Sequence, residues 1–330
     1  VLARGPQFDE DLLVVDLDLA PSTVNVADSS SDGVVHVTIS DTPTPAYAAA
    51  PATLAARLDP IGEVYRAVQL GLHDYVRKNG FRSVLVGVSG GIDSTLVATI
   101  AADALGGENV VAISNPSKYS SQGSRDDAAD LAENLGLDYR VIPIEPMVSA
   151  FLDSVNLTGI AEENLQARVR AVIWMGLGNQ EGHLVLTNGN KSEVSVGYST
   201  LYGDSVGGYA PLKDVDKSRV WALARWRNNA ALDAGKLPPI PESSITKPPS
   251  AELAPGQLDS DRLPPYDVLD RILKRYLDEG WSPDRIIQVG DDAAAVHRIV
   301  RLVEINEFKR RQAAPNLRVS QKAFGTGRRF

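Results

Sequence analysis

The sequence predicts an α/β fold in which a parallel sheet carries helices on both faces, with further helices toward the C-terminus. Short apolar runs alternate with segments of helical periodicity between residues 60 and 187. After Gly208 only the helical periodicity continues. Strands that alternate with helices are joined by right-handed crossovers, so such strands lie parallel between two helical layers.

The expected elements follow from the spacing of apolar residues and from the residues that end each segment. Apolar residues recur at helical spacing from Ile61 to Val76, and Gly80 ends that helix. Short unbroken apolar runs predict buried strands. Strands are expected over 83–88, 110–114, 139–144 and 183–187. Helices are expected over 60–79, 93–105, 124–135, 164–177, 215–228, 266–279 and 292–312.

Other segments differ from this pattern. Residues 1–20 end in an alternating run, Leu12–Leu19, which predicts a strand. Residues 21–57 are rich in Ala, Pro, Ser and Thr, which is typical of a linker, and contain one short candidate strand at Val34–Ile39. Residues 238–265 hold 8 of the 20 prolines. A proline-rich segment of this length inside a compact domain is often a functional loop.

Composition argues against several classes of function. The formal charge of −9 argues against nucleic-acid or anionic-membrane binding along the whole chain. Between His297 and Phe330, however, nine Lys and Arg residues accompany two Glu residues, which predicts a local anion site or a solvated helix and tail. There are no cysteines, the four histidines lack ligand spacing, and no apolar run reaches ~18 residues. We therefore expect a cytoplasmic protein with neither a nucleic-acid nor a membrane partner.

The strongest motif is a strand-to-helix turn, SGGIDS at residues 89–94, directly after the apolar run that ends at Val88. Gly90 and Gly91 let the backbone approach a ligand closely, and the free N–H groups of the first helical turn favour an anion. Asp93 places a carboxylate where a phosphate is expected, which is unfavourable without an intervening cation, so the turn predicts Mg²⁺. The motif is neither a Walker A loop nor a GxGxxG fingerprint. A tight turn with an Asp or Ser helix cap would show the same spacing.

SGGIDS after an apolar strand resembles the pyrophosphate loop of the N-type ATP pyrophosphatases. Further blocks resemble the glutamine-dependent version of the NAD synthetases within that family. One block reads TNGNKSE, GYSTLYGD and GGYAPLKD in succession and is followed by Lys217. The later blocks read ESSITKPPSAEL, EFKRRQ and SQKAFG. The resemblance extends from about Leu58 to the C-terminus and implies an adenine nucleotide alpha hydrolase-like, Rossmann-like fold.

The resemblance implies a reaction as well as a fold. Members of the family amidate deamido-NAD (nicotinic acid adenine dinucleotide) to NAD through an adenylate, consume ATP with Mg²⁺, and release AMP and pyrophosphate. The glutamine-dependent members take the ammonia from glutamine. Two alternatives are another amidating adenylate-former, such as a GMP-synthetase-like enzyme, and a nucleotide-binding module without catalysis.

The same resemblance assigns roles on the ATP side. Asp93, Glu193 and Lys217 are the expected catalytic residues, with Asp93 and Glu193 as the Mg²⁺ carboxylates. Asn188 stands where the family commonly has Thr, and its amide keeps hydrogen-bonding capacity with a different geometry. The expected ATP-binding residues are Gly87, Ser89, Gly90, Gly91, Ile92, Asp93, Ser94, Asn188 and Lys217.

Deamido-NAD would be bound mainly by a predicted helix and by the C-terminal region. Asn164 and Arg168 are four residues apart and share a helix face, while Arg170 is a further candidate there. In the basic C-terminal helix, Lys309 would bring its ammonium to a phosphate or carboxylate of the substrate. The expected substrate-binding residues are Asn164, Arg168, Glu193, Asp204 and Lys309.

The resemblance also implies a domain plan. Residues 1–20 resemble the end of a nitrilase-like glutaminase domain, 21–57 would be a linker, and 58–330 would be the synthetase domain. Because the chain has no cysteine, it lacks the thiol of glutaminase chemistry and would need free ammonia or an upstream domain. A homodimer or larger homo-oligomer is expected, and residues 116–123 and 238–265 are the expected lids.

Overall fold

The computed structural model describes residues 1–17, 42, 48 and 52–325, which divide into two compact units, Val1–Leu58 and Asp59–Phe330. In the first unit Arg4 forms a parallel bridge with Leu54. Residues 12–17, the described part of the expected strand 12–19, are not in a strand, because no described neighbour pairs with them. The other strand expected in this region, over 34–39, lies outside the described residues.

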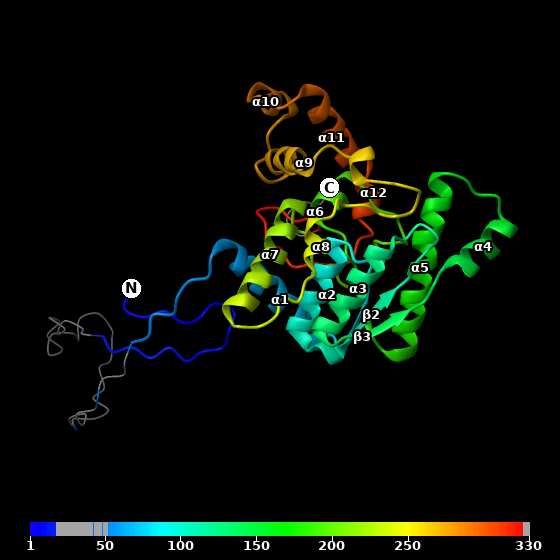
Figure 1. The fold of residues 1–330 in the computed structure, drawn as a ribbon. Helices are drawn as coiled ribbons and strands as arrows, with labels where there is room; N and C mark the ends of the chain where they lie inside the picture. Colours follow the sequence, from blue (N-terminus) through cyan, green and yellow to red (C-terminus); the bar gives the residue numbers. More distant parts are fainter. Residues whose placement is uncertain (18–41, 43–47, 49–51, 326–330) are drawn as a thin grey trace, which may run out of the picture. The chain divides into compact units, whose positions relative to one another are not determined.

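A parallel sheet forms the centre of the second unit, which confirms the predicted fold class (Figure 1). The strand order is β3-β2-β1-β4, and every pairing between neighbours is parallel. Val84 is opposite Val110 on one side and Leu184 on the other. The strands are β1 Val84–Gly87, β2 Val110–Ser114, β3 Asp138–Val141 and β4 Leu184–Leu186. The strand expected over 139–144 ends early because Pro143 has no N–H group to donate.

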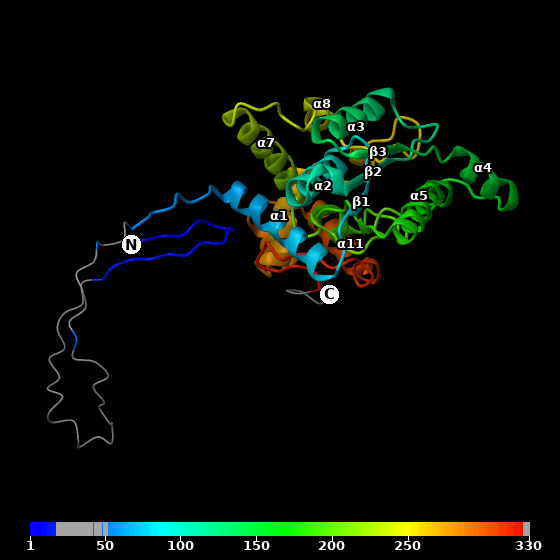
Figure 2. The same cartoon turned by 90° about the horizontal axis from the view of Figure 1, so that it is seen from below.

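Helices cover both faces of the sheet, because alternate side chains of each strand point to opposite faces. On one face Val84 and Val86 pack with apolar residues of α1 (Pro60–Lys78), α2 (Ile92–Leu105), α3 (Gln122–Leu135) and α7 (Lys217–Asp233). On the other face Leu85 packs with Trp174 of α5 (Ile160–Glu181). Figure 2 shows α2 and α5 on opposite sides of the strands.

Local signals explain where the helices begin and end. The carboxylate of Asp59 accepts from the N–H groups of Ile61 and Gly62 and so caps α1, while Ser121 caps α3 by accepting from Ser124. Gly182 in the left-handed conformation ends α5, which is longer at both ends than the expected 164–177. Short helices that the sequence did not predict are α4 Glu145–Ser154, α6 Lys191–Val196, α8 Glu242–Thr246 and α10 Pro283–Gln288.

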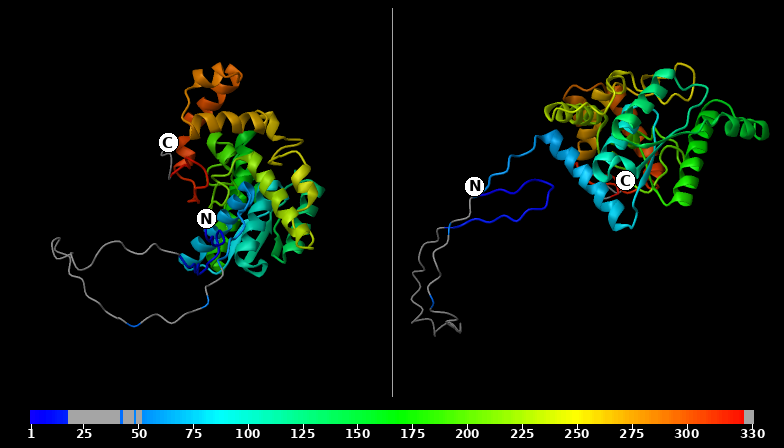
Figure 3. Two further views of the ribbon diagram at one scale, coloured as in Figure 1. Left: turned by 90° about the vertical axis from the view of Figure 1, so that its left-hand side faces the viewer. Right: turned by 60° about the horizontal axis from the view of Figure 1, so that its bottom comes forward.

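A second apolar core lies in the C-terminal part of this unit. It joins α6 with α9 (Tyr266–Leu273), α10 and α11 (Ala293–Ile305). A π-helical turn, Lys274–Asp278, continues α9, so the helix expected over 266–279 is present with a change of geometry. The helix expected over 292–312 is broken at Asn306, after which α12 covers Glu307–Arg310. Figure 3 shows these C-terminal helices gathered beyond the sheet.

Two buried lysines, Lys191 and Lys213, bind residues of the C-terminal segment and so hold that segment against the residues that follow β4. The ammonium of Lys191 lies 2.9 Å from Asp278 Oδ1, 3.2 Å from Asp214 Oδ1 and 2.7 Å from Ser320 Oγ. The ammonium of Lys213 donates to the carbonyl of Ala314 at 2.6 Å. Among the described residues, the helices lack the combination of length and apolarity that crossing a bilayer requires.

Lys213 generates a prediction for stability against pH. Burial lowers the pKa of Lys213 to about 8. Between pH 8 and about 10.5, the pKa of a lysine in the unfolded chain, Lys213 binds more protons in the unfolded chain than in the folded one. The contribution of Lys213 to the free energy of unfolding therefore rises with pH. We expect the unfolding free energy of wild type minus that of Lys213→Met to rise by roughly 3 kcal/mol across this interval. Urea unfolding at a series of pH values measures it.

The matched control for this prediction is Lys236→Met, because Lys236 is exposed. Its difference from wild type should stay flat over the same pH range. A flat profile for Lys213→Met as well would contradict a lowered pKa in the folded protein.

Candidate active site

A cavity of about 400 Å³ opens at the carboxyl end of β1. The chain leaves β1 for β2 on one side, whereas β4 lies on the other side, so β1 ends where the winding of the sheet changes direction. Open parallel sheets bind ligands at such points. The cavity wall combines the turn after β1, part of α5, residues 197–204, residues 247–259 and Lys309.

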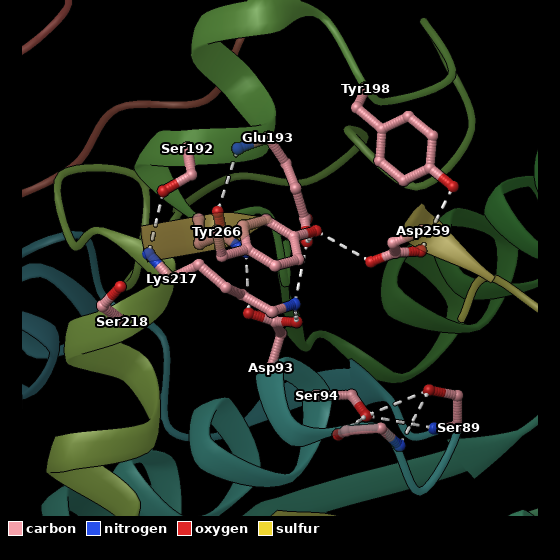
Figure 4. A network of polar contacts seen from close by, with 12 residues as sticks. Ser89, Asp93, Ser94, Ser192, Glu193, Tyr198, Lys217, Ser218, Asp259 and Tyr266 are labelled. Carbon is pink, nitrogen blue, oxygen red and sulfur yellow. Dashed lines mark hydrogen bonds and ion pairs between the residues drawn. The ribbon is translucent and has the colours of Figure 1, made fainter. Parts of the chain in front are cut away.

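The turn after β1 folds onto itself through its two serines. The hydroxyl of Ser94 accepts from the N–H of Ser89 at 3.2 Å and donates to the carbonyl of Gly91 at 3.0 Å (Figure 4). Gly91 is the N-cap residue of α2 and has no side chain to satisfy the first N–H groups of that helix. Ile92, Asp93 and Ser94 line the cavity, so the first turn of α2 offers N–H donors and a positive helix end to an anion there.

Gly90 is the residue of the turn that must be glycine. Its φ of +77° lies in the left-handed region, and a Cβ would lie 2.2 Å from the carbonyl oxygen of Ser124. Its own carbonyl accepts from the hydroxyl of Ser244 at 3.0 Å. Gly90 does not itself line the cavity, whereas the other predicted turn residues do. Its role is therefore to let the turn pack against α3 and α8.

Gly87 and Asn188 lie together beside this turn. A Cβ on Gly87 would lie 2.3 Å from the Trp174 ring, so glycine is needed for the close packing of α5 on β1. The side-chain amide of Asn188 donates to the Gly87 carbonyl at 2.8 Å. The Oδ1 atom of Asn188 is buried and has no hydrogen-bond partner. It thus leaves an acceptor at the cavity wall for a ligand donor.

Three predicted residues converge from three helices. The ammonium of Lys217, the first residue of α7, lies 2.5 Å from Asp93 Oδ2 and 2.8 Å from Glu193 Oε1 (Figure 4). Asp93 is in α2 and Glu193 is in α6. Asn190 links the carboxylate-bearing helices, because its Nδ2 donates to Asp93 at 2.9 Å while its Oδ1 accepts from the Glu193 N–H at 3.0 Å.

Burial governs the electrostatics of this cluster. Burial raises the pKa of Glu193 to about 7, against the opposing charge of Lys217, and the neighbouring Asp93 carboxylate raises it further. Burial by itself would lower the pKa of Lys217, but the two carboxylates outweigh it and raise that pKa well above its usual range. Lys217 therefore stays charged between the two carboxylates.

The donor set of the cluster fits a magnesium ion that also takes oxygen ligands from a nucleotide. Asp93 and Glu193 present carboxylate oxygens to one point, where the structure places the Lys217 ammonium. No group of three or more Asp, Glu, His or Cys side chains able to hold a metal occurs among the residues the structure describes. Mg²⁺ is usually held by one or two carboxylates together with phosphates and waters, so two carboxylates suffice.

Three of the residues expected to bind deamido-NAD lie in the cavity wall outside this cluster, whereas Glu193 belongs to the cluster itself. Asn164 Oδ1 accepts from the Thr200 hydroxyl and Asp204 Oδ1 accepts from the Thr200 N–H, both at 2.7 Å. Lys309 donates to the carbonyls of Gly197 and Ser199 at 2.7 Å each. Asn164, Asp204 and Lys309 all line the cavity. Burial raises the pKa of the Asp204 carboxyl and lowers that of the Lys309 ammonium.

The two arginines of α5 are placed differently. Arg168 is exposed, does not line the cavity, and donates to the Leu201 carbonyl at 3.2 Å. It does share a helix face with Asn164, since both contact the 200–204 segment. Arg170 lines the cavity and donates to the Asn115 carbonyl at 3.0 Å, and burial lowers its pKa to about 10. The structure therefore brings Arg170, rather than Arg168, to the cavity.

The two segments expected to act as lids both reach the cavity. Pro116 and Ser120 line it from the first segment, and residues 247–259 line it from the second. The segments are joined through Glu252, whose carboxylate accepts from the hydroxyls of Ser121 and Ser124 at 2.8 Å each. Closure itself stays a prediction.

The basic C-terminal region is partly built into the fold. Besides Lys309 in the cavity wall, Arg310 is buried, donates to the Ser195 carbonyl at 2.7 Å and lies 4.8 Å from the centre of the Phe324 ring. This arrangement differs from a wholly solvated basic helix. It fixes α12 against α6, which carries Glu193.

Several residues of the site were missed by sequence reasoning. Asn190 had a usable local signal, because an Asn three residues before a Glu is typical of a helix N-cap. Tyr198, Asp259 and Tyr266 had none, because their chemistry arises only where distant segments meet.

Comparison with known proteins places the chain in a family. The NAD synthase family model matches residues 64–313. The glutamine-dependent NAD(+) synthetase of Xanthomonas campestris pv. campestris is 52% identical over 272 residues, which are 81% of this chain and 49% of that protein. The enzyme of that name from Synechocystis sp. is 44% identical over 336 residues, covering 100% of this chain and 55% of that protein.

A solved structure agrees with these relatives. The glutamine-dependent NAD+ synthetase from Acinetobacter baumannii, in complex with ADP, is 43% identical with a TM-score of 0.57, and the match covers 84% of this chain and 50% of that one. The chain thus spans about half the length of the relatives it matches. With most of its second unit matched by the family model, the chain belongs to the NAD synthase family.

Proposed function

We propose that this chain converts deamido-NAD to NAD by ATP-dependent amidation through an adenylate, with release of AMP and pyrophosphate. The convergence of Asp93, Glu193 and Lys217 beside an anion-binding turn carries this proposal. A nucleotide-binding module has less need of two acidic side chains next to phosphates unless a cation is used. The relatives named above, which are glutamine-dependent NAD(+) synthetases, support the amidating reaction.

The proposed reaction consists of two successive displacements. The substrate carboxylate forms a bond to the α-phosphorus of ATP while the bond to the β-phosphate oxygen breaks, and pyrophosphate leaves with that electron pair. Ammonia then forms a bond to the acyl carbon, AMP leaves, and the nitrogen loses a proton to water. Both steps join or separate anionic groups, so positioning and charge neutralisation dominate catalysis.

Each part of the cavity has a role in this reaction. The N–H groups of α2 and the ammonium of Lys217 bind the phosphates of ATP, while Asp93 and Glu193 would hold Mg²⁺. The bound Mg²⁺ would neutralise charge on the phosphates. Asn164, Asp204 and Lys309, with Arg170, orient deamido-NAD on the opposite wall. Residues 116–123 and 238–265 close over the adenylate and keep water from it.

The source of ammonia lies outside this chain in our proposal. The chain has no cysteine, and the relatives are about twice its length. We propose an upstream nitrilase-like glutaminase domain whose last residues are 1–20, a linker over 21–57, and a synthetase domain from 58 onward. The boundary between the two compact units falls between Leu58 and Asp59, which supports only the proposed start of the synthetase domain.

We further propose that the synthetase domain pairs with a second copy in the cytoplasm. Helix α5 exposes Val172 and Met175, which are 72% and 36% exposed and lie three residues apart on one face of the helix. A contiguous apolar face of this kind is a candidate partner surface.

The direct test is incubation of the chain with Mg-ATP and deamido-NAD, with either ammonium or glutamine as nitrogen donor. We expect NAD and pyrophosphate in equal amounts with ammonium, and none with glutamine, because glutaminase chemistry needs an upstream domain. NAD is measured enzymatically and pyrophosphate by a coupled assay. Turnover that depends on xanthosine monophosphate instead would favour a GMP-synthetase-like enzyme. ATP binding without any pyrophosphate release would favour a non-catalytic module.

The turn can be tested separately from the chemistry. Gly90→Ala adds a Cβ into the Ser124 carbonyl and strains a left-handed backbone. We expect ATP affinity to fall by about 10-fold or more, because ~1–3 kcal/mol of strain is absorbed by a shift of the turn. Isothermal titration calorimetry with Mg-ATP measures it. Gly123→Ala is the control, since its Cβ meets nothing within 4 Å, and equal losses in both variants would contradict this role.

The carboxylates are tested by neutral isosteres. We expect Asp93→Asn to abolish adenylate formation, and Glu193→Gln to lower kcat by about 100-fold while weakening ATP binding less, because each removes a negatively charged ligand of the Mg²⁺ that would neutralise the phosphates. Pyrophosphate release measures both. Asp126→Asn, an exposed carboxylate of α3, should keep wild-type turnover. Wild-type turnover in Glu193→Gln would refute its assigned role.

A further inference from the structure

Tyr266, the first residue of α9, places its hydroxyl between two carboxylates (Figure 4). The phenol oxygen lies 3.0 Å from Glu193 Oε1 and 2.8 Å from Asp259 Oδ2. The same carboxylate oxygen of Glu193, Oε1, is thus contacted by both the Lys217 ammonium and the Tyr266 hydroxyl. A glutamate side chain with several rotatable bonds needs such contacts to hold one orientation.

The ring of Tyr266 is held in place by the same cluster. It meets Trp221 of α7 edge to face, with the ring centres 5.8 Å apart. The ammonium of Lys217 lies 5.1 Å from the centre of the Tyr266 ring. These contacts hold the ring of Tyr266 in place without using its hydroxyl. The hydroxyl is therefore free to act on the carboxylates.

Asp259 supplies a fixed anchor on the far side of the hydroxyl. It is buried, and its other carboxylate oxygen accepts from the Tyr198 hydroxyl at 3.2 Å. Its backbone N–H donates to the Pro249 carbonyl at 3.1 Å. The anchor belongs to the proline-rich segment that lines the cavity, so the phenol connects this segment to Glu193.

The helix that carries Tyr266 is itself joined to α6 and α7, two of the three helices of the cluster. Asp270, one turn further along α9, accepts from the backbone N–H of Ser218 at 2.8 Å and from the hydroxyl of Ser192. The Ser192 hydroxyl in turn accepts from the N–H of Lys217 at 2.9 Å. The N-cap residue of α7 makes no side-chain cap. The carboxylate of Asp270, which belongs to α9, caps α7 instead by accepting from the Ser218 N–H.

We propose that Tyr266 is a positioning residue that fixes the Glu193 carboxylate toward the Lys217 ammonium and the Asp93 carboxylate. Its ring is fixed by Trp221 and its hydroxyl is anchored on Asp259. It acts on the reaction through Glu193, and this proposal rests on the proposed function of the cluster.

Tyr266→Phe removes the hydroxyl and keeps the ring. We expect kcat to fall by about 10-fold and KM for deamido-NAD to stay within about twofold, because the contacts of the hydroxyl with the Glu193 and Asp259 carboxylates are lost while the ring stays in place. Calorimetry should show weaker binding of Mg-ATP, by about 10-fold, and unchanged binding of ATP in EDTA. Calorimetry measures binding without turnover, so its result tests the role of Tyr266 even if the proposed reaction does not occur.

A double-mutant cycle distinguishes positioning from general structure. In a Glu193→Gln background, Tyr266→Phe should add little further loss, because both changes affect one interaction. Losses that multiply independently would overturn the proposal, as would wild-type kcat and Mg-ATP affinity in Tyr266→Phe.

Tyr276→Phe is the matched control. This tyrosine lies in the π-helical turn that continues α9, and its hydroxyl bonds to Glu304 at the surface. Tyr276→Phe should keep wild-type kcat, and an equal loss there would overturn the proposal.

A second variant covers the case in which Tyr266→Phe destabilises the fold. If Tyr266→Phe lowers the melting temperature by more than about 5 °C, Asp259→Asn replaces it in the same measurements. Asp259→Asn keeps the Tyr266 hydroxyl and weakens the contact that anchors this hydroxyl. We then expect the same selective loss of Mg-ATP binding, and unchanged binding would refute positioning.

Discussion

The site depends on one buried ammonium shared between two carboxylates. Lys217 lies between Asp93 and Glu193, and each of the three comes from a different helix. Two partly buried carboxylates this close would repel one another without a cation, so their convergence is favoured by a positive charge. The surrounding structure serves to keep these three helix ends together: Asn190 joins the carboxylate helices, and Asp270 joins the start of α7 to α6.

This arrangement explains why the site lies where it does in the fold. The parallel sheet brings the end of β1 and the end of β4 to one edge, so the turn at Ser89 and the segment at Asn188 become neighbours. Glu193 follows Asn188 in a short helix, and Lys217 begins the helix after the next connection. The topology thus gathers residues that are about a hundred positions apart without any local sequence signal that they meet.

The central sheet and most of its helices could be predicted, because each depends on local periodicity and, for α1, on the end signal at Gly80, whereas the caps at Gly182 and Ser121 were not recognised. The short helices α4, α6 and α10 were missed, since packing rather than propensity stabilises helices of this length. Family motifs identified Asp93, Glu193 and Lys217 as candidates, but their mutual contacts required coordinates. Arg168 illustrates the limit: its spacing from Asn164 was right for a shared face, yet only Asn164 lines the cavity, while Arg168 donates to the Leu201 carbonyl beside it.

The cavity wall includes a lysine from the last helix of the structure, Lys309 of α12, whereas the phosphate-binding turn follows the first strand. During translation the two are made at different times. A nascent chain on the ribosome carries the turn at Ser89 well before Lys309 reaches the carbonyls of Gly197 and Ser199. Ribosome stalling or premature termination between these points therefore yields a chain with a nucleotide loop but an unfinished opposite wall.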